Sequence, residues 1–252
     1  MPQVHVDYHE QGYNEPYYFA PAAAPFHEVI TAWQSDFQTM VGKNNAKHFD
    51  ANGWLYFTKE RFDLFYPSYG DTYPTYNGSV GMTYEQGGHS RGGLAVQTDE
   101  GDILTLKDRL MHHTTTGLST IEITSLNAEK VVNEFKKYFD NAREGVGSLY
   151  KSYILTTNDL GRINAVKKIL TSNGIIFGTN FSSTGVMGYN YFNGKSELVK
   201  AEKFSIVVNA NQPKSLLAKV LLEPISKLAD SATYDITAWS IPYAYGVNAY
   251  AV

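Results

Sequence analysis

Residues 78–93 read Gly-Ser-Val-Gly-Met-Thr-Tyr-Glu-Gln-Gly-Gly-His-Ser-Arg-Gly-Gly, and this stretch decides how the chain is interpreted. Residues 79–84 are rich in β-favouring side chains and predict a strand. The strand delivers one carboxylate, Glu85, and the glycines that follow allow a tight turn or a close approach to a ligand. Open α/β sheets bind ligands beyond the carboxyl ends of their strands, so Glu85 is a candidate site residue. A polar strand end in a surface turn is the simpler alternative.

A second strand is predicted at residues 4–9, Val-His-Val-Asp-Tyr-His. Alternation along a strand places His5, Asp7 and His9 on one face, which suggests metal ligation. The Cα atoms of His5 and His9 would lie about 13 Å apart, too far for both side chains to reach one ion easily. We therefore expect either a metal site that uses one histidine and is completed from elsewhere, or a polar strand end in which Asp7 orients a neighbouring histidine.

The segments between these strands predict a helix and a long aromatic loop. Apolar residues recur at helical spacing from 26 to 41, so we expect a core-packed helix that begins near Pro25, with polar residues 43–53 forming a turn. Residues 59–77 are irregular and rich in aromatic side chains, among them Tyr66 and Tyr69. Irregular loops of this length are uncommon unless they bind something, so we expect its tyrosines to lie over Glu85.

The second half of the chain has a different pattern of predicted helices and strands. After an acidic loop at 95–101 and two helices, glycines at 145 and 147 mark the expected boundary between domains 1–146 and 147–252. A strand at 152–156, a helix that follows Asp159 and a strand at 175–177 predict a β-α-β unit and hence a parallel sheet. The chain as a whole is thus predicted to be α/β.

Composition excludes several classes of function. The net charge of −4 provides no electrostatic footprint for nucleic acid. No apolar run approaches the ~20 residues of a membrane helix, so we expect neither nucleic acid nor membrane as a partner. Cysteine is absent, which excludes a thiolate nucleophile and cysteine-ligated zinc. The oligomeric state is not indicated.

One short motif suggests a serine hydrolase. Residues 88–92, Gly-His-Ser-Arg-Gly, fit the nucleophile elbow Gly-x-Ser-x-Gly, and Asp102 and His112 follow in the order of that fold. The elbow requires a helix directly after the serine, whereas two glycines and a polar loop follow Ser90. A serine hydrolase that uses Ser90 is therefore the third-ranked interpretation.

Two motifs resemble those of the zinc metallocarboxypeptidases, the carboxypeptidase A-like peptidases. Residues 81–85, Gly-Met-Thr-Tyr-Glu, resemble the strand that carries the family's catalytic glutamate, and Arg91 follows at a similar spacing. Residues 7–12, Asp-Tyr-His-Glu-Gln-Gly, resemble the segment that bears the third zinc ligand. The resemblance implies that Glu85 is the general base, that His9 is a zinc ligand, and that Arg91 binds substrate. It also implies that Tyr66 is the mobile tyrosine over the substrate, with Tyr69 as a rival or as a substrate-binding residue.

The same resemblance sets expectations for the whole chain. The family's first two zinc ligands come from a His-x-x-Glu segment, which this chain lacks. We therefore expect the second half of an open mixed-sheet carboxypeptidase domain, with an incomplete zinc site and no carboxypeptidase activity alone. The resemblance implies a peptide C-terminus as the substrate and an extracytoplasmic or secreted full-length protein.

Residues 147–252 resemble a glutamine-amidotransferase-like, flavodoxin-type α/β module. A working enzyme of that type needs a cysteine nucleophile, so this module is expected to be non-catalytic. The alternative for the chain as a whole is a non-enzymatic α/β module whose aromatic cleft binds peptides or glycans without metal.

Overall fold

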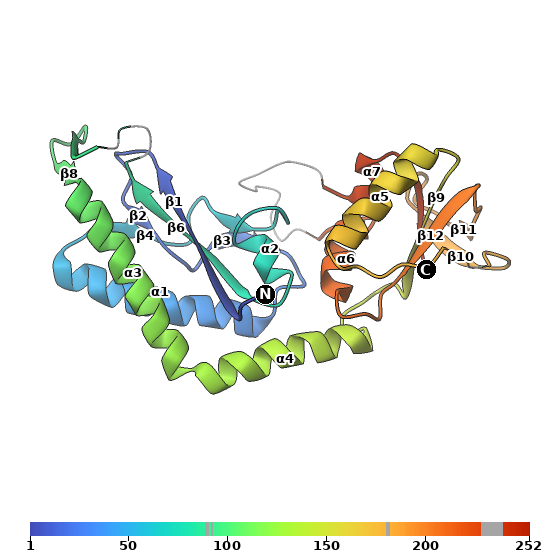
Figure 1. The fold of residues 1–252 in the computed structure, drawn as a ribbon, viewed down its shortest axis with the longest axis horizontal. Helices are drawn as coiled ribbons and strands as arrows, with labels where there is room; N and C mark the ends of the chain where they lie inside the picture. Colours follow the sequence, from blue (N-terminus) through green and yellow to red (C-terminus); the bar gives the residue numbers. More distant parts are fainter. Residues whose placement is uncertain (89–90, 92, 180–181, 228–238) are drawn as a thin grey trace. The chain divides into compact units, whose positions relative to one another are not determined.

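The computed structural model describes residues 1–88, 91, 93–179, 182–227 and 239–252 (Figure 1). They form a mixed α/β structure with several sheets, as the sequence predicts. The chain divides into two compact units, of which the first comprises Met1–Phe135 and the second begins at Lys136. The division thus lies inside helix α4 (Ala128–Glu144), before the glycines at 145 and 147. None of the helices in the described ranges combines the length and apolar character of a membrane span.

A four-stranded mixed sheet organises the first unit. Its order is β1 (Val4–Gln11), β6 (Val80–Gly87), β2 (Tyr17–Tyr18) and β4 (Tyr56–Phe57). The two long strands lie where the sequence predicts them and pair in parallel, from Val4 opposite Val80 to Gln11 opposite Gly87 (Figure 1). β2 then pairs antiparallel with β6 and parallel with β4. β6 therefore lies inside the sheet, between β1 and β2.

Helix α1 (Ala32–Asn52) begins later than the apolar spacing predicts. A reciprocal capping box between Thr31 and Gln34 fixes its start, and Gly53 ends it in the left-handed conformation, with φ of 67°. Pro25 lies instead in β3 (Ala23–Phe26), which pairs with β5 (Asp63–Leu64). The polar residues expected to form a turn at 43–53 are almost entirely helical.

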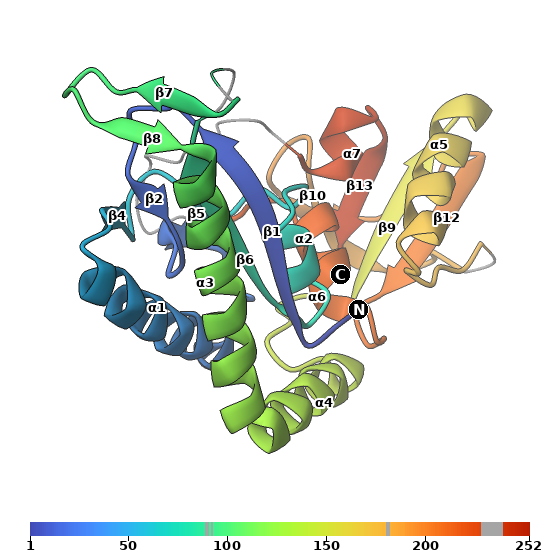
Figure 2. The same ribbon diagram turned by 60° about the vertical axis from the view of Figure 1, so that its left-hand side comes forward.

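The core of the first unit lies between α1, the sheet and the start of α4. Alternate residues of β6 face this core, and the buried cluster contains Tyr17, Phe19, Ala20, Phe37, Val41, Phe49, Val80, Met82, Tyr84 and Val131. Both α1 and α3 (Leu106–Leu126) pack against β6 and against each other (Figure 2). Residues 95–101, expected as an acidic loop, contribute to a hairpin of β7 (Ala95–Gln97) and β8 (Ile103–Thr105).

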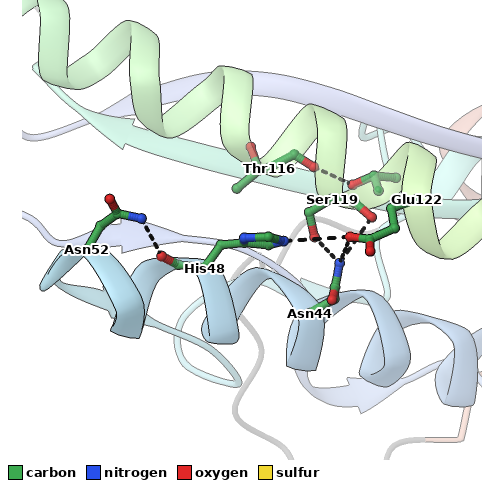
Figure 3. A network of polar contacts seen from close by, with 7 residues as sticks. Asn44, His48, Asn52, Thr116, Ser119 and Glu122 are labelled. Atoms are coloured by element: carbon green, nitrogen blue, oxygen red, sulfur yellow. Dashed lines mark hydrogen bonds and ion pairs between the residues drawn. The ribbon is translucent and has the colours of Figure 1, made fainter.

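Helix α3 has its polar and apolar faces reversed relative to the usual pattern. Its buried residues are polar: Arg109, His112, Thr116, Ser119 and Thr120. Hydrogen bonds hold this face in place: Tyr84 Oη lies 2.7 Å from Thr120 Oγ1, and Asn44 of α1 donates to Ser119 Oγ at 2.9 Å (Figure 3). Leu118 and Ile121, which lie on the apolar stripe of the helix, are more than 60% exposed. Polar contacts therefore fix the position of α3, and its apolar side faces outward.

The second unit contains a five-stranded sheet. Its order is β11 (Ser196–Leu198), β10 (Met187–Asn190), β13 (Asn248–Ala251), β9 (Ser152–Thr157) and β12 (Phe204–Asn209). Helix α5 (Leu160–Ser172) packs against β9 and β12 (Figure 2), and the unit also contains α6 (Ser215–Leu222) and α7 (Ile241–Ala244). The strand predicted at 152–156 and the helix after Asp159 are both present.

The predicted parallel β-α-β unit is wrong. All described pairings in this sheet are antiparallel, and residues 175–177 form no strand. The physical reason is a side chain that takes the place of a neighbouring strand: the Gln212 amide accepts from the backbone N–H of Ile176 at 2.7 Å and donates to its carbonyl at 3.1 Å. Flavodoxin-type sheets are parallel, so the flavodoxin-like, amidotransferase-like expectation finds no support here.

Candidate functional site

A cavity of about 160 Å³ lies beside the carboxyl-terminal halves of β1 and β6. Its lining combines charged, aromatic and glycine residues: Asp7, His9, Phe62, Asp63, Tyr69, Gly70, Asp71, Thr83 and Glu85. The parallel register places His9 opposite Glu85 and Asp7 opposite Thr83. Since alternate residues share a face, these side chains meet on one side of the sheet. His5, two residues before Asp7, lines a neighbouring cavity of about 440 Å³.

Asp7 and His9 form a pair within β1. His9 Nε2 lies 2.8 Å from Asp7 Oδ2, and the His9 side chain is 54% exposed. No hydrogen bond to His9 Nδ1 occurs in the described part of the chain. The Asp7 carboxylate lies directly against Gly70, where an added Cβ would come within 1.7 Å of Oδ2. The orientation of His9 thus depends on Asp7, and the position of Asp7 depends on a glycine in the aromatic loop.

Glu85 is buried, with only 7% of its surface exposed. Burial raises its pKa to about 7; the nearby His9 opposes this rise, and the negative charges of Asp7 and Asp71 add to it. A carboxyl group with a near-neutral pKa can accept and return a proton at physiological pH. The electrostatics of the cavity therefore suit Glu85 to a proton-transfer role.

Asp71 is a site residue that sequence reasoning missed. Burial raises its pKa to about 6, while hydrogen bonds from Thr83 and from the Thr72 backbone N–H counteract this effect. Asp71 is also the N-cap of the short helix α2 (Thr72–Thr75). An Asp-Thr pair at a helix start was the available signal in the sequence. The cavity thus gathers several carboxylates around a single histidine.

The two candidate tyrosines occupy different positions. Tyr69 lines the cavity, whereas Tyr66 is absent from its lining and packs its ring against Tyr69, with a centroid distance of 5.1 Å. Arg91 is exposed and absent from the lining; its guanidinium lies over the Tyr13 ring at 5.3 Å. Ser90 lies outside the described residues, so the serine-hydrolase alternative has no structural description.

The residues present do not make a complete zinc centre. Within the described ranges, no group of three or more His, Asp or Glu side chains is placed to hold a metal ion. A catalytic zinc takes three protein ligands, and here His9 is the one histidine at the cavity. The cavity instead provides one oriented imidazole, a buried carboxyl group whose pKa is near neutral, and an aromatic wall. No family model, curated protein or solved structure matches this chain.

Proposed function

We propose that the first unit carries one side of a peptide-hydrolysing site of the zinc carboxypeptidase type. In this proposal Glu85 is the proton acceptor, His9 is one metal ligand, and polypeptide outside this chain supplies the remaining ligands. The supporting observation is the parallel register of β1 and β6, which aligns His9 with Glu85 at one cavity. The substrate would be a peptide C-terminus, as the sequence motifs imply.

The role of His9 follows from its contact with Asp7. When the Asp7 carboxylate accepts a hydrogen bond from Nε2–H, the lone pair of the neutral ring is on Nδ1. A carboxylate that fixes the tautomer and orientation of an imidazole is the usual support for a metal-ligating histidine. We therefore assign Nδ1 as the ligating atom and Asp7 as the residue that positions it.

The roles of Glu85 and Tyr69 follow from their places in the cavity. Glu85 is buried and lies beside His9 across the strand pair, so a proton taken up there stays close to a ligand bound at the cavity. Tyr69 forms part of the cavity wall and can donate a hydrogen bond to a peptide carbonyl. The ring of Tyr66 packs edge-on against the ring of Tyr69. Of the two tyrosines, the proposal therefore assigns substrate contact to Tyr69.

The test is a Zn²⁺ titration of the isolated chain followed by NMR of the histidine and glutamate side chains. We expect the His9 signals to shift and the pKa of Glu85 to fall, because a bound cation favours the carboxylate form. His9→Ala should abolish both effects. His48→Ala is the matched control, because His48 also pairs with a carboxylate, Glu122, at 3.6 Å on the surface (Figure 3).

Two results would count against the proposal. If Zn²⁺ shifted His48 but not His9, or left the titration of Glu85 unchanged, the assignment of the two roles would be wrong. If the purified chain removed the C-terminal residue of a peptide and a chelator inhibited it, the remaining ligands would have to lie within the chain.

A further inference from the structure

A second, larger cavity lies on the other face of β6. It has a volume of about 570 Å³, and Gln86 is among its lining residues. Consecutive residues of a strand point to opposite faces, so Glu85 and Gln86 serve different cavities.

The lining of this cavity is strongly acidic. Five carboxylates contribute to it, and none of its described lining residues is Lys or Arg: the acids are Glu15, Asp99, Glu100, Asp102 and Asp108. Glu15 is paired with Arg61 at 3.0 Å, and the Asp108 carboxylate accepts hydrogen bonds from Thr105, the N-cap of α3. Glu100 and Asp102 are exposed and make no ion pair within the described residues. The cavity thus favours a positively charged ligand.

The ring of His112 has an unpaired acceptor. Its side chain lines the cavity and is only 8% exposed. Gln86 donates its amide N–H to the Gly87 carbonyl at 3.0 Å, so the Gln86 oxygen faces His112 Nδ1 at 2.8 Å and accepts a hydrogen bond from Nδ1–H. Burial lowers the pKa of His112 to about 4, and the ring is therefore neutral. Nε2 is then a buried acceptor that has no hydrogen-bond partner in the described structure.

Aromatic side chains complete the cavity. The Trp54 ring lies 4.6 Å from the His112 ring, and Tyr13 and Leu55 also line the cavity. A buried acceptor without a donor costs about 1–3 kcal/mol, so a ligand that supplies an N–H removes this penalty. An aromatic wall accommodates an aliphatic stem and attracts a cation.

We propose that this cavity binds an organic cation that carries N–H donors on an aliphatic stem. One N–H donates to His112 Nε2, the stem lies along Trp54, and the charge is balanced by Glu100 and Asp102. Lysine or arginine side chains of a peptide and free polyamines share this chemistry.

The test is an NMR titration that follows the side-chain nitrogen signals of His112 and Trp54. The probes are the N-acetyl amides of lysine, arginine and norleucine, together with spermidine. We expect the cationic probes to shift His112 Nε2, and norleucine amide, which has the stem without the charge, to bind at least about tenfold more weakly. Tighter binding of the amides identifies a peptide as the source, and tighter binding of spermidine identifies a polyamine.

Variants separate the effect of the cavity charges on binding from a general loss of structure. Replacing Glu100 and Asp102 with Gln and Asn should weaken cation binding by about two- to tenfold, since both groups are exposed. Glu122→Gln removes one carboxylate charge away from the cavity lining and should leave binding unchanged. Equal binding of norleucine amide and the cations, or no shift of His112 with any probe at millimolar concentration, would overturn the proposal.

Discussion

Replacing Gly70 with alanine should dislodge Asp7 from the candidate site. An added Cβ would lie 1.7 Å from Asp7 Oδ2, 2.5 Å from its Cγ and 2.9 Å from its Cβ. The backbone φ of Gly70 lies outside the left-handed region, so alanine fits the local backbone and the clash falls on Asp7. Rotating the carboxylate relieves the first two contacts and leaves the third, so the strand or the loop must also shift.

The expected loss of stability in Gly70→Ala is the sum of two contributions. Overpacking costs about 1–3 kcal/mol, and loss of the partly exposed Asp7–His9 pair costs at most about 1 kcal/mol more. We therefore expect the free energy of unfolding to fall by about 1–4 kcal/mol, measured by urea denaturation, and His9 to lose its fixed tautomer in nitrogen NMR spectra. Gly12→Ala is the control, because its Cβ would meet Glu15 Cγ at an ordinary 3.6 Å. Unchanged stability and tautomer in Gly70→Ala would refute the reasoning.

Three further predictions concern buried polar groups. The folded-state pKa of Glu85, about 7, lies above its ordinary 4.5, so the stability linked to its protonation is present below pH 4.5 and lost as the pH rises through 7. Glu85→Gln should accordingly stabilise the protein at pH 8 by about 1–3 kcal/mol and change little at pH 4.5 in urea denaturation. The pKa of His112 is lowered from 6.5 to about 4, so stability should fall as the pH drops through this range; His112→Gln should reduce the difference in Tm between pH 7 and pH 4.5. Thr120→Val leaves the Tyr84 hydroxyl without its 2.7 Å partner and should cost about 1–3 kcal/mol, and an unchanged urea midpoint would contradict that role.

The two strands that carry the candidate site could be predicted from sequence because their signals are local. β1 and β6 are short runs of β-favouring or alternating residues, and a glycine-rich loop follows β6. Asp71 could not be found in this way. Its proximity to Glu85 depends on the loop folding back against the sheet, where Gly81 allows the Asp71 carbonyl to approach closely.

The sequence predictions failed where a side chain replaced the expected backbone or apolar contact. The capping box of Thr31 and Gln34 overrides the apolar spacing that extends back to residue 26. In the second unit, the Gln212 amide satisfies Ile176 and removes the need for a neighbouring strand. On α3, apolar spacing is present, yet hydrogen-bonding partners on the sheet and α1 decide which face is buried.

Strand β6 separates two sites that can change independently. Val80, Met82 and Tyr84 face the core and Gln86 continues that series, while Thr83 and Glu85 line the smaller cavity. Point substitutions at Gln86 can change the lining of the larger cavity and leave the Glu85 side chain in place. A single-residue insertion directly before Glu85 would turn the Glu85 carboxylate toward the face that Gln86 now occupies, at the larger cavity, and turn Gln86 toward the smaller cavity. A point substitution in β6 therefore changes one site at a time. The insertion or deletion of one residue before Glu85 disables both sites together.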